Sequence, residues 1–361
     1  MTKEQSLKLL KTLTEAFGVS GFEAPVRTVV GDLLAPLSTG MQTDNMGSLI
    51  VSKTGFEEYP KLLLAAHLDE VGFMVTRITD GGFIKFQQLG GWWSQVLPDQ
   101  RVEIRATNGT VAGVIGAKPP HILSKEEAEK TVKLRSMYVD IGATCREEAE
   151  KAGVRVGDPI VPCSRFEVCK NGKSFMGKAL DDRAGCAMIV EVFRELDGRS
   201  FPGNLYGVMT VQEEVGLRGA GTSVTVVKPD VAVVLDVTVA TDTPNVGEDE
   251  ATTRAGLGKG PVVGFYDATM IPNIALRDLV ASTAAEAGIP FQAEVMPGGG
   301  TDAGKIHVYR QGVPSIVIGI PVRYIHSHVG IAHLDDYANG VELVLALINK
   351  LDRDTVDSLK A

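Results

Sequence analysis

The stretch Leu62-Leu-Leu-Ala-Ala-His-Leu-Asp69 decides how this chain of 361 residues folds. Five consecutive apolar residues stand between Lys61 and His67. A continuous apolar run of this length is typical of a strand that is buried on both faces, as in parallel sheets covered by helices on both sides. The run ends in an imidazole and a carboxylate, so residues that can carry chemistry stand where this strand stops.

Further apolar runs predict more strands of the same sheet, and amphipathic segments predict the helices between them. We expect strands at residues 47–52, 204–211, 231–235 and 314–318. We expect helices at residues 4–17, 24–34, 183–196, 274–287 and 336–351. Strands that alternate with helices of this length indicate an α/β fold with a mixed, largely parallel central sheet flanked by helices.

Residues 70–162 differ from the rest of the chain, because short alternating runs and dense glycines replace the helical periods. Asn108-Gly109 lies between two alternating runs and is the strongest short-range signal of a β-hairpin. Ser124 and Glu127 form a capping box for a short helix. We therefore predict a small inserted β-domain at residues 70–162. Residues 1–69 and 163–361 would together form one discontinuous α/β domain.

The composition is that of an ordinary globular protein, with 44% hydrophobic and 22% charged residues. A formal net charge of -9 argues against a nucleic-acid or anionic-membrane surface, which needs basic patches. The N-terminal residues lack the apolar core of a signal peptide, and no apolar run approaches the roughly 18 residues of a membrane span. The cysteines form no C-x-x-C pair and are most simply free thiols. We expect a cytoplasmic protein.

Residues of metal-ligand type follow the predicted strands. In open α/β sheets, ligands bind at the carboxyl ends of strands, so we expect one pocket to collect His67, Glu213, Glu214, Asp236 and His326. Asp181 and Asp182 join them from the start of a helix, where unpaired backbone N–H groups favour carboxylates. Each element has a structural alternative, such as a helix cap at Asp181-Asp182 or a solvated turn at Glu213-Glu214. Their joint occurrence favours a metallohydrolase.

Two imidazoles and several carboxylates suit Zn²⁺, Co²⁺ or Mn²⁺ rather than a thiolate-selective metal. The ligand-type residues are numerous enough for two ions. A carboxylate shared between two ions holds them about 3.5–4 Å apart around a water molecule whose pKa they lower.

At these residues the sequence resembles the M42 family of dinuclear metal aminopeptidases, over essentially the whole chain. The resemblance rests on five segments: Ala66-His-Leu-Asp-Glu-Val-Gly-Phe73, Gly177-Lys-Ala-Leu-Asp-Asp-Arg183, Val211-Gln-Glu-Glu-Val-Gly-Leu-Arg-Gly-Ala220, Gly299-Gly-Thr-Asp-Ala303 and Arg323-Tyr-Ile-His-Ser327. It implies a fold of the zinc-peptidase type and two divalent metal ions per subunit, with Zn or Co expected first and Mn as a further candidate.

Carried over residue by residue, the resemblance implies a role for each ligand-type position. His67 and Asp236 would hold one ion, Glu214 and His326 the other, and Asp181 would bridge both. Asp69 would be the carboxylate that fixes the tautomer of His67. Glu213 would be the general base that takes a proton from water and returns it to the departing amine.

Several choices depend mainly on the resemblance. Related sequences favour Asp181 over Asp182 as the bridge and His326 over His328 as the ligand. His121, His307 and His333 match no ligand motif and are expected to be structural or surface residues. The glycines at 298–300 with Thr301 and Asp302 resemble a tight turn into a helix, either lining the pocket or simply capping that helix.

The resemblance also implies partners and a substrate class. The inserted domain would mediate dimerisation, and dimers would assemble into a hollow tetrahedral dodecamer that admits short peptides; the alternative is an ordinary subdomain. Trp92 and Trp93 would be interface anchors or, with slightly more weight, core residues. The motifs are closest to glutamyl aminopeptidases, and an acidic N-terminal residue would need a basic partner. Arg254, Lys259, Lys305 and Arg323 are available, but nothing in the sequence assigns them to the pocket. Leucyl or broad specificity is the alternative.

Two other classes of protein are alternatives to a metallopeptidase. A glycoside hydrolase would use Glu213 and Glu214 as its carboxylate pair, but adjacent residues in an extended chain point opposite ways, and the histidines would have no role. A non-catalytic scaffold would not need competent residue types at every ligand position and at Glu213.

Overall fold

An eight-stranded sheet forms the centre of the larger part of the molecule. The computed structural model describes residues 1–244, 246 and 254–360. The middle of the sheet is parallel and runs in the order β12 (Asn204–Thr210), β3 (Lys61–His67), β13 (Val231–Val239) and β16 (Ser315–Val322). The edges carry β1 (Gly40–Thr43) and β2 (Leu49–Thr54) on one side, and β14 (Val262–Tyr266) and β15 (Gln292–Val295) on the other. β2 and β14 run antiparallel to their inner neighbours, so the sheet is mixed.

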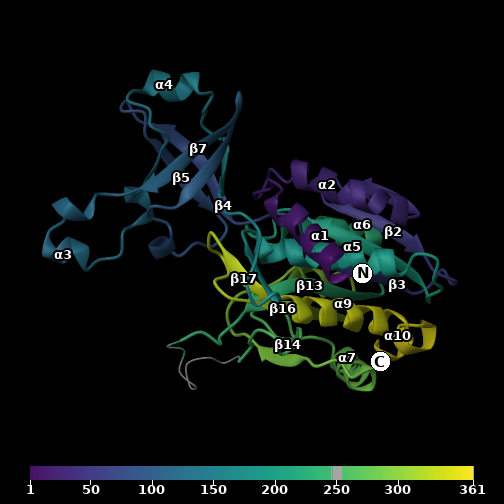
Figure 1. Cartoon of the computed structure of the whole chain (residues 1–361). Helices are drawn as coiled ribbons and strands as arrows, with labels where there is room; N and C mark the ends of the chain where they lie inside the picture. The colour runs from purple at the N-terminus through teal and green to yellow at the C-terminus, as the bar shows by residue number, and fades with distance from the viewer. Residues whose placement is uncertain (245, 247–253, 361) are drawn as a thin grey trace.

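Helices cover both faces of this sheet (Figure 1). One layer contains α1 (Lys3–Glu15), α2 (Ala24–Leu34), α5 (Leu180–Glu195), α7 (Ile274–Ala287) and α9 (Leu334–Ile348), followed by the short α10 (Arg353–Ser358). The other face carries α6 (Arg218–Val227) and α8 (Ala303–Ile306). Because side chains alternate across a strand, Leu62 and Leu64 enter the core under α5 while Leu63 and Ala65 enter the core under α6. This double burial is the reason for the continuous apolar run of β3.

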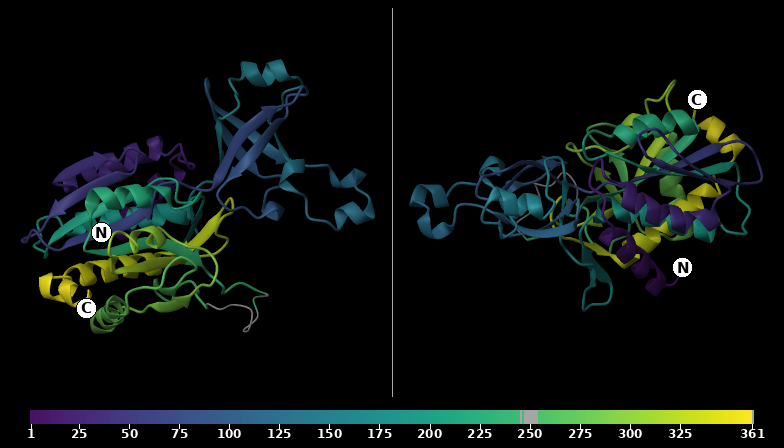
Figure 2. Two further views of the ribbon diagram at one scale, coloured as in Figure 1. Left: turned by 180° about the vertical axis from the view of Figure 1, so that it is seen from behind. Right: turned by 90° about the horizontal axis from the view of Figure 1, so that it is seen from above.

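A closed barrel projects from one end of the α/β part, as the views in Figure 2 show. Its strands are β4 (Gly72–Ile78), β5 (Ile84–Leu89), β8 (Tyr138–Asp140), β7 (Gly109–Gly116), β6 (Arg101–Ala106) and β9 (Pro159–Pro162), in that order around the barrel. It has a hydrophobic core of its own, which includes Phe73, Ile104 and Val139. Its loops carry α3 (Lys125–Ala128) and α4 (Arg146–Lys151).

Short elements complete the chain. A three-stranded antiparallel sheet consists of β10 (Glu167–Val168), β11 (Ser174–Gly177) and β17 (Gly330–His333). Single 3-10 turns are η1 (Ala35–Leu37), η2 (Ser94–Val96), η3 (Pro120–Ile122) and η4 (Leu134–Ser136). Of the helices in the described part of the chain, none is long and apolar enough to cross a lipid bilayer. All four cysteines are free thiols, as expected.

The predicted fold class is confirmed, as are the hairpin at Asn108-Gly109 and the capping box of Ser124 and Glu127. Two strands were predicted too short, because β13 continues to Val239 and β16 to Val322, and the two strands pair with each other up to these ends. Asp236 therefore lies within a strand rather than just after one. The short strands β1, β14 and β15 and the small sheet were missed, since runs of two to five residues carry little periodic signal. The domain boundaries at residues 70 and 162 stay a prediction.

Candidate metal centre

His67 is the last residue of β3, and its ring is held in one orientation. Its Nδ1–H donates to the backbone carbonyl of Asp69 at 2.9 Å, whereas the nearest carboxylate oxygen of Asp69 is 3.7 Å away. A carbonyl oxygen can only accept, so Nδ1 carries a proton, and in the neutral imidazole Nε2 is the nitrogen whose lone pair can bind a metal. The backbone of Asp69 therefore fixes the tautomer, a task that the sequence analysis assigned to its carboxylate.

The carboxylate of Asp69 instead holds the turn after β12. It is fully buried and accepts hydrogen bonds from the backbone N–H of Glu213 at 2.9 Å and of Glu214 at 3.2 Å. The hydroxyl of Ser20 donates to it at 2.6 Å. Asp69 thus sets the position of the expected general base and of one expected ligand at the same time. Ser20 belongs to no recognisable motif, and sequence reasoning missed it.

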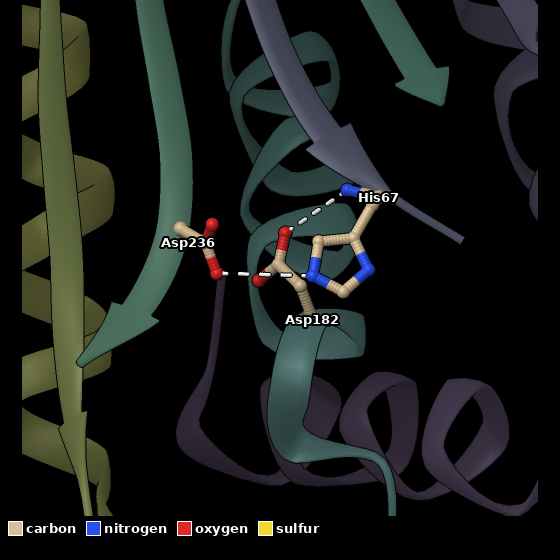
Figure 3. Close-up of side chains that lie close together, drawn as sticks. All are labelled: His67, Asp182 and Asp236. Carbon is tan, nitrogen blue, oxygen red and sulfur yellow. Dashed lines mark hydrogen bonds and ion pairs between the residues drawn. The ribbon is translucent and has the colours of Figure 1, made fainter. Parts of the chain in front are cut away.

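Asp181 and Asp182 are joined by a cis peptide bond at the start of α5, and their side chains have different partners. Asp181 Oδ1 lies 2.9 Å from His67 Nε2, and its Oδ2 lies 3.1 Å from His326 Nε2. Asp182 accepts the backbone N–H of His67 at 3.1 Å and that of Gly185 at 2.9 Å. Figure 3 shows this contact of Asp182 with the His67 backbone. The geometry therefore favours Asp181 as the residue that faces two ligand positions.

Three further expected ligands lie close to His67 and Asp181: Asp236, Glu214 and His326. Asp236 Oδ1 lies 3.9 Å from His67 Nε2, as Figure 3 also shows. Glu214 Oε2 lies 3.3 Å from His326 Nε2, and its other oxygen, Oε1, is buried and has no hydrogen-bond partner in the part of the chain that the structure describes. His326 lies in the loop between β16 and β17 with a positive φ of 54°. The arrangement has two halves, with His67 and Asp236 on one side and Glu214 and His326 on the other.

Glu213 lies beside the His67 half of the site. Its Oε2 is 3.9 Å from His67 Nε2, and the turn held by Asp69 directs it into the same cavity. Burial raises its pKa well above the usual value, and the attraction of His67 only partly offsets this effect. A carboxyl group with a raised pKa is suited to accept and return a proton near neutral pH.

The electrostatics of the cluster fit bound cations. Burial, together with the charge of Asp181, raises the pKa of Glu214 and of Asp236 to about 8 each. Burial acts in the same direction on Asp181, but without metal His326 and His67 can be protonated, and their hydrogen bonds and positive charge outweigh the effect of burial and lower the pKa of Asp181. Packing so many buried carboxylates together is unfavourable unless positive charge is added. Divalent ions supply that charge and displace the protons, so these residues fit the metal that the resemblance implies.

Ligand atoms of two groups of residues lie within 4.8 Å of one another: His67, Asp182 and Asp236, and His67, Asp181 and Glu214. The first group would assign Asp182 to the metal. We favour Asp181, because the oxygens of Asp182 already accept two backbone amides and serve to hold β3 against α5.

The remaining histidines lie away from the cluster. His328 is buried against the ring of Trp92, with ring centroids 5.2 Å apart, and burial lowers its pKa to about 4. His307 interacts with the backbone of Ala303, and His333 caps α9. His121 lies on the barrel side of the chain, in η3.

A cavity of about 520 Å³ opens onto the cluster. Besides the expected metal ligands, its lining includes Leu217, Val239, Met296, Ile325 and the turn at residues 298–300. That turn leads into α8 with Asp302 as its N-cap residue, so the glycine segment both lines the pocket and begins a helix. In the described part of the lining no residue is Lys or Arg. Arg323 pairs with Asp242 at 2.7 Å instead.

Arg183 is a structural residue of the site that sequence reasoning named only as part of a motif. Its guanidinium group is fully buried and donates to the carbonyl oxygens of Leu68, Leu13, Ala16 and Gly18 at 2.7–2.9 Å. It therefore ties the N-terminal segment to the strand end that carries His67. The available signal was an arginine that directly follows the Asp181-Asp182 pair.

Comparison with known proteins agrees with this geometry. A family model described as M42 glutamyl aminopeptidase matches residues 47–343. The chain belongs to the M42 peptidase family. This M42 chain is 36% identical to a glutamyl aminopeptidase of Lactococcus lactis, over 97% of this chain and 98% of that protein. It is 35% identical to a lysyl aminopeptidase of Pyrococcus furiosus, over 95% of this chain and 97% of that protein.

Solved structures of the family have the same fold. A TET aminopeptidase from a marine sediment Thaumarchaeota archaeon superimposes with a TM-score of 0.96 at 49% identity, and the match covers 99% of both chains. The TET1 peptidase of Pyrococcus horikoshii, which can assemble into a tetrahedron or a large octahedral shell, superimposes with a TM-score of 0.85 at 34% identity, over 96% of this chain and all of that one. As an M42 aminopeptidase, the protein is a hydrolase that acts on N-terminal residues, and the family is metal-dependent.

Proposed function

We propose that this M42 aminopeptidase releases the N-terminal residue of short peptides with the aid of two divalent metal ions, Zn or Co in the first place and Mn as a further candidate. The observation that carries the proposal is the carboxylate of Asp181, whose two oxygens face different imidazoles at 2.9 and 3.1 Å. A carboxylate in that position supports two adjacent ion sites. His67 and Asp236 would complete one site, and Glu214 and His326 the other.

The residues of the chain divide the remaining work. When bound, the ions supply Lewis-acid polarisation of the scissile carbonyl and lower the pKa of a water molecule. Glu213 holds the proton taken from that water and returns it to the departing amine. The carboxylate of Asp69 keeps Glu213 in place by accepting the backbone N–H of Glu213 at 2.9 Å. The apolar side chains of the lining exclude water around the N-terminal residue of the substrate.

There are two candidates for the side chain that the enzyme prefers at the N-terminal residue of its substrate. The resemblance predicts an acidic N-terminal residue, which needs a cation close to its carboxylate. In the described part of the lining no Lys or Arg is present, while Leu217, Val239, Met296 and Ile325 are apolar. This observation favours leucyl or broad specificity as the second candidate. The similar proteins do not decide the preference, because a glutamyl and a lysyl aminopeptidase are almost equally similar to this chain.

A substrate panel with metal control tests the proposal. The protein is stripped with EDTA, reloaded with Zn²⁺, Co²⁺ or Mn²⁺, and assayed on Glu, Asp, Leu and Lys p-nitroanilides. We expect two ions per chain by elemental analysis, activity only after reloading, and no activity on cellulose. Hydrolysis of cellulose that survives EDTA, with no peptide cleavage, would contradict the proposal. A preference for Glu and Asp supports the first specificity, and a preference for Leu supports the second.

We further propose that the chain assembles into dimers through the barrel, and that dimers build a tetrahedral dodecamer in the cytoplasm. The assembly of the Pyrococcus horikoshii relative supports the oligomer, and the free thiols fit a reducing compartment. Native mass spectrometry measures the assembly: twelve chains are expected, and a barrel-deleted chain should lose the dimer.

A further inference from the structure

A loop of the barrel forms one wall of the metal centre. The Gly90–Trp92 loop, residues 90–92, follows β5, and Gly91 lines the cavity over the cluster. A Cβ atom on Gly91 would lie 3.2 Å from His326 Nδ1, and one on Gly90 would lie 3.2 Å from Glu214 Oε2. The loop therefore lies directly against both expected ligands of the second half of the site, and a methyl group on Gly91 would force His326 to move by a few tenths of an ångström.

Trp92 connects this loop to the barrel core on one side and to the His326 loop on the other. Its ring stacks on Phe73, a fully buried core residue of the barrel, with centroids 4.8 Å apart and an interplanar angle of 26°. The same ring also contacts the ring of His328, with centroids 5.2 Å apart. The neighbouring Trp93 is 62% exposed.

His328 and His326 belong to one tight loop, so displacement of one displaces the other. Tyr324 and His326 both have positive φ angles, 62° and 54°. The hydroxyl oxygen of Ser327 lies 2.7 Å from the carbonyl oxygen of Tyr324 and 3.0 Å from that of Val329, and its one proton can be donated to either, which closes the loop internally. The ring nitrogens of His328 are buried and have no hydrogen-bond partner among the described residues. Packing against the ring of Trp92 is a contact that His328 makes with the barrel.

We propose that Trp92 positions His326 for metal binding through its contact with His328, so that the barrel is a structural part of the metal centre and not only a module for assembly. The inference rests on the proposed two-ion function. Trp92 touches no reacting atom and is a positioning residue. Because it acts on His326, it should affect the ion held by Glu214 and His326 and leave the ion held by His67 and Asp236 unchanged.

Metal affinity of variants tests this inference without an activity readout. Both ions are titrated against a chelator in the full-length protein, with Co²⁺ as the probe and elemental analysis of the retained metal. Trp92→Ala should weaken the binding of one of the two ions by about 10- to 100-fold, the usual loss of metal affinity when a group that supports a ligand is removed. Trp92→Phe keeps a ring between Phe73 and His328 and should restore the affinity. Trp93→Ala is the matched control and should bind both ions like the wild type.

A second variant guards against misfolding of Trp92→Ala. Gly91→Ala removes no packing and adds only a methyl group 3.2 Å from His326 Nδ1, so it should weaken the same ion. In a His326→Ala background, one ion remains, and adding Trp92→Ala should leave its affinity unchanged. Weakening of this remaining ion would show a general loss of structure and overturn the inference.

The outcomes separate the inference from the function on which it rests. A wild-type protein that binds fewer than two ions contradicts the two-ion function, and with it the inference. A wild type with two ions, together with Trp92→Ala and Gly91→Ala variants that bind both as tightly, overturns the inference and leaves the function standing. Selective loss of one ion in these variants, with rescue by Trp92→Phe, supports the inference.

Discussion

Replacing Glu213 by Gln should abolish most of the activity and leave the metal ions and the fold in place. Among the described residues, none forms a hydrogen bond with the Glu213 carboxylate, and its nearest ionic neighbour is His67 Nε2 at 3.9 Å. The backbone N–H that Asp69 holds is unaffected by the change. Glutamine has nearly the same size and shape as glutamate, so the change keeps the packing at this position and removes only the carboxylate that accepts the proton.

The expected magnitude follows from the lost proton transfer. General-base catalysis contributes about 10²–10⁴ in rate. At about 1.4 kcal/mol per factor of ten, the activation free energy should rise by about 3–5 kcal/mol. We expect kcat to fall by that factor with KM nearly unchanged, and the free energy of unfolding to change by less than about 0.5 kcal/mol. Steady-state kinetics on a p-nitroanilide, elemental analysis and urea unfolding measure these quantities.

The adjacent residue offers the matched control. Glu214→Gln makes the same chemical change one position along the chain, but removes a carboxylate that faces His326 at 3.3 Å. It should lower the metal content as well as the activity. If Glu213→Gln also loses metal, Glu213 is a ligand and the assignment of roles is wrong. If Glu213→Gln keeps both ions and retains activity within tenfold of the wild type, another group is the base.

Three further predictions concern residues that the structure distinguishes from their neighbours. His326→Ala should bind one ion in place of two by elemental analysis. His328→Phe should bind both, because it keeps a ring against Trp92 and the His328 nitrogens form no hydrogen bond with any described residue. Asp181→Asn should reduce the metal content, whereas Asp182→Asn should keep it. Asp182→Asn should instead lower the free energy of unfolding by about 1–3 kcal/mol, because the one amide oxygen of Asn cannot accept both backbone N–H groups. The reverse pattern would make Asp182 the bridge. Arg183→Lys should lower the free energy of unfolding in urea by at least about 2 kcal/mol, because one ammonium cannot reach every carbonyl oxygen that the guanidinium binds. An unchanged urea midpoint would contradict this expectation.

Much of the architecture could be predicted because it depends on local patterns. The apolar run before His67 predicted a doubly buried strand, and burial of Leu63 and Leu64 on opposite faces is the physical reason. The Asn108-Gly109 turn predicted its hairpin because few residues accept the backbone that such a turn requires. The approximate place of the site followed from the parallel strands, whose carboxyl ends meet at one edge.

The tertiary structure decided the roles within the site. Asp181 and Asp182 are identical in type and adjacent in sequence, and only the packing of α5 against β3 turns Asp182 toward backbone amides and Asp181 toward both imidazoles. Asp69 binds His67 through its carbonyl and the Glu213 turn through its carboxylate, which no spacing rule distinguishes.

The sequence by itself determined the kind of fold, the family motifs and the residue types available for a metal centre, because these depend on composition and short-range order. Which oxygen or nitrogen faces which neighbour depends on backbone angles and on contacts between segments far apart in the chain. The loop at Gly90–Trp92 illustrates the limit, since its approach to His326 joins the barrel to the α/β part across more than two hundred residues of sequence. Long-range packing of that kind leaves no local signature in the sequence.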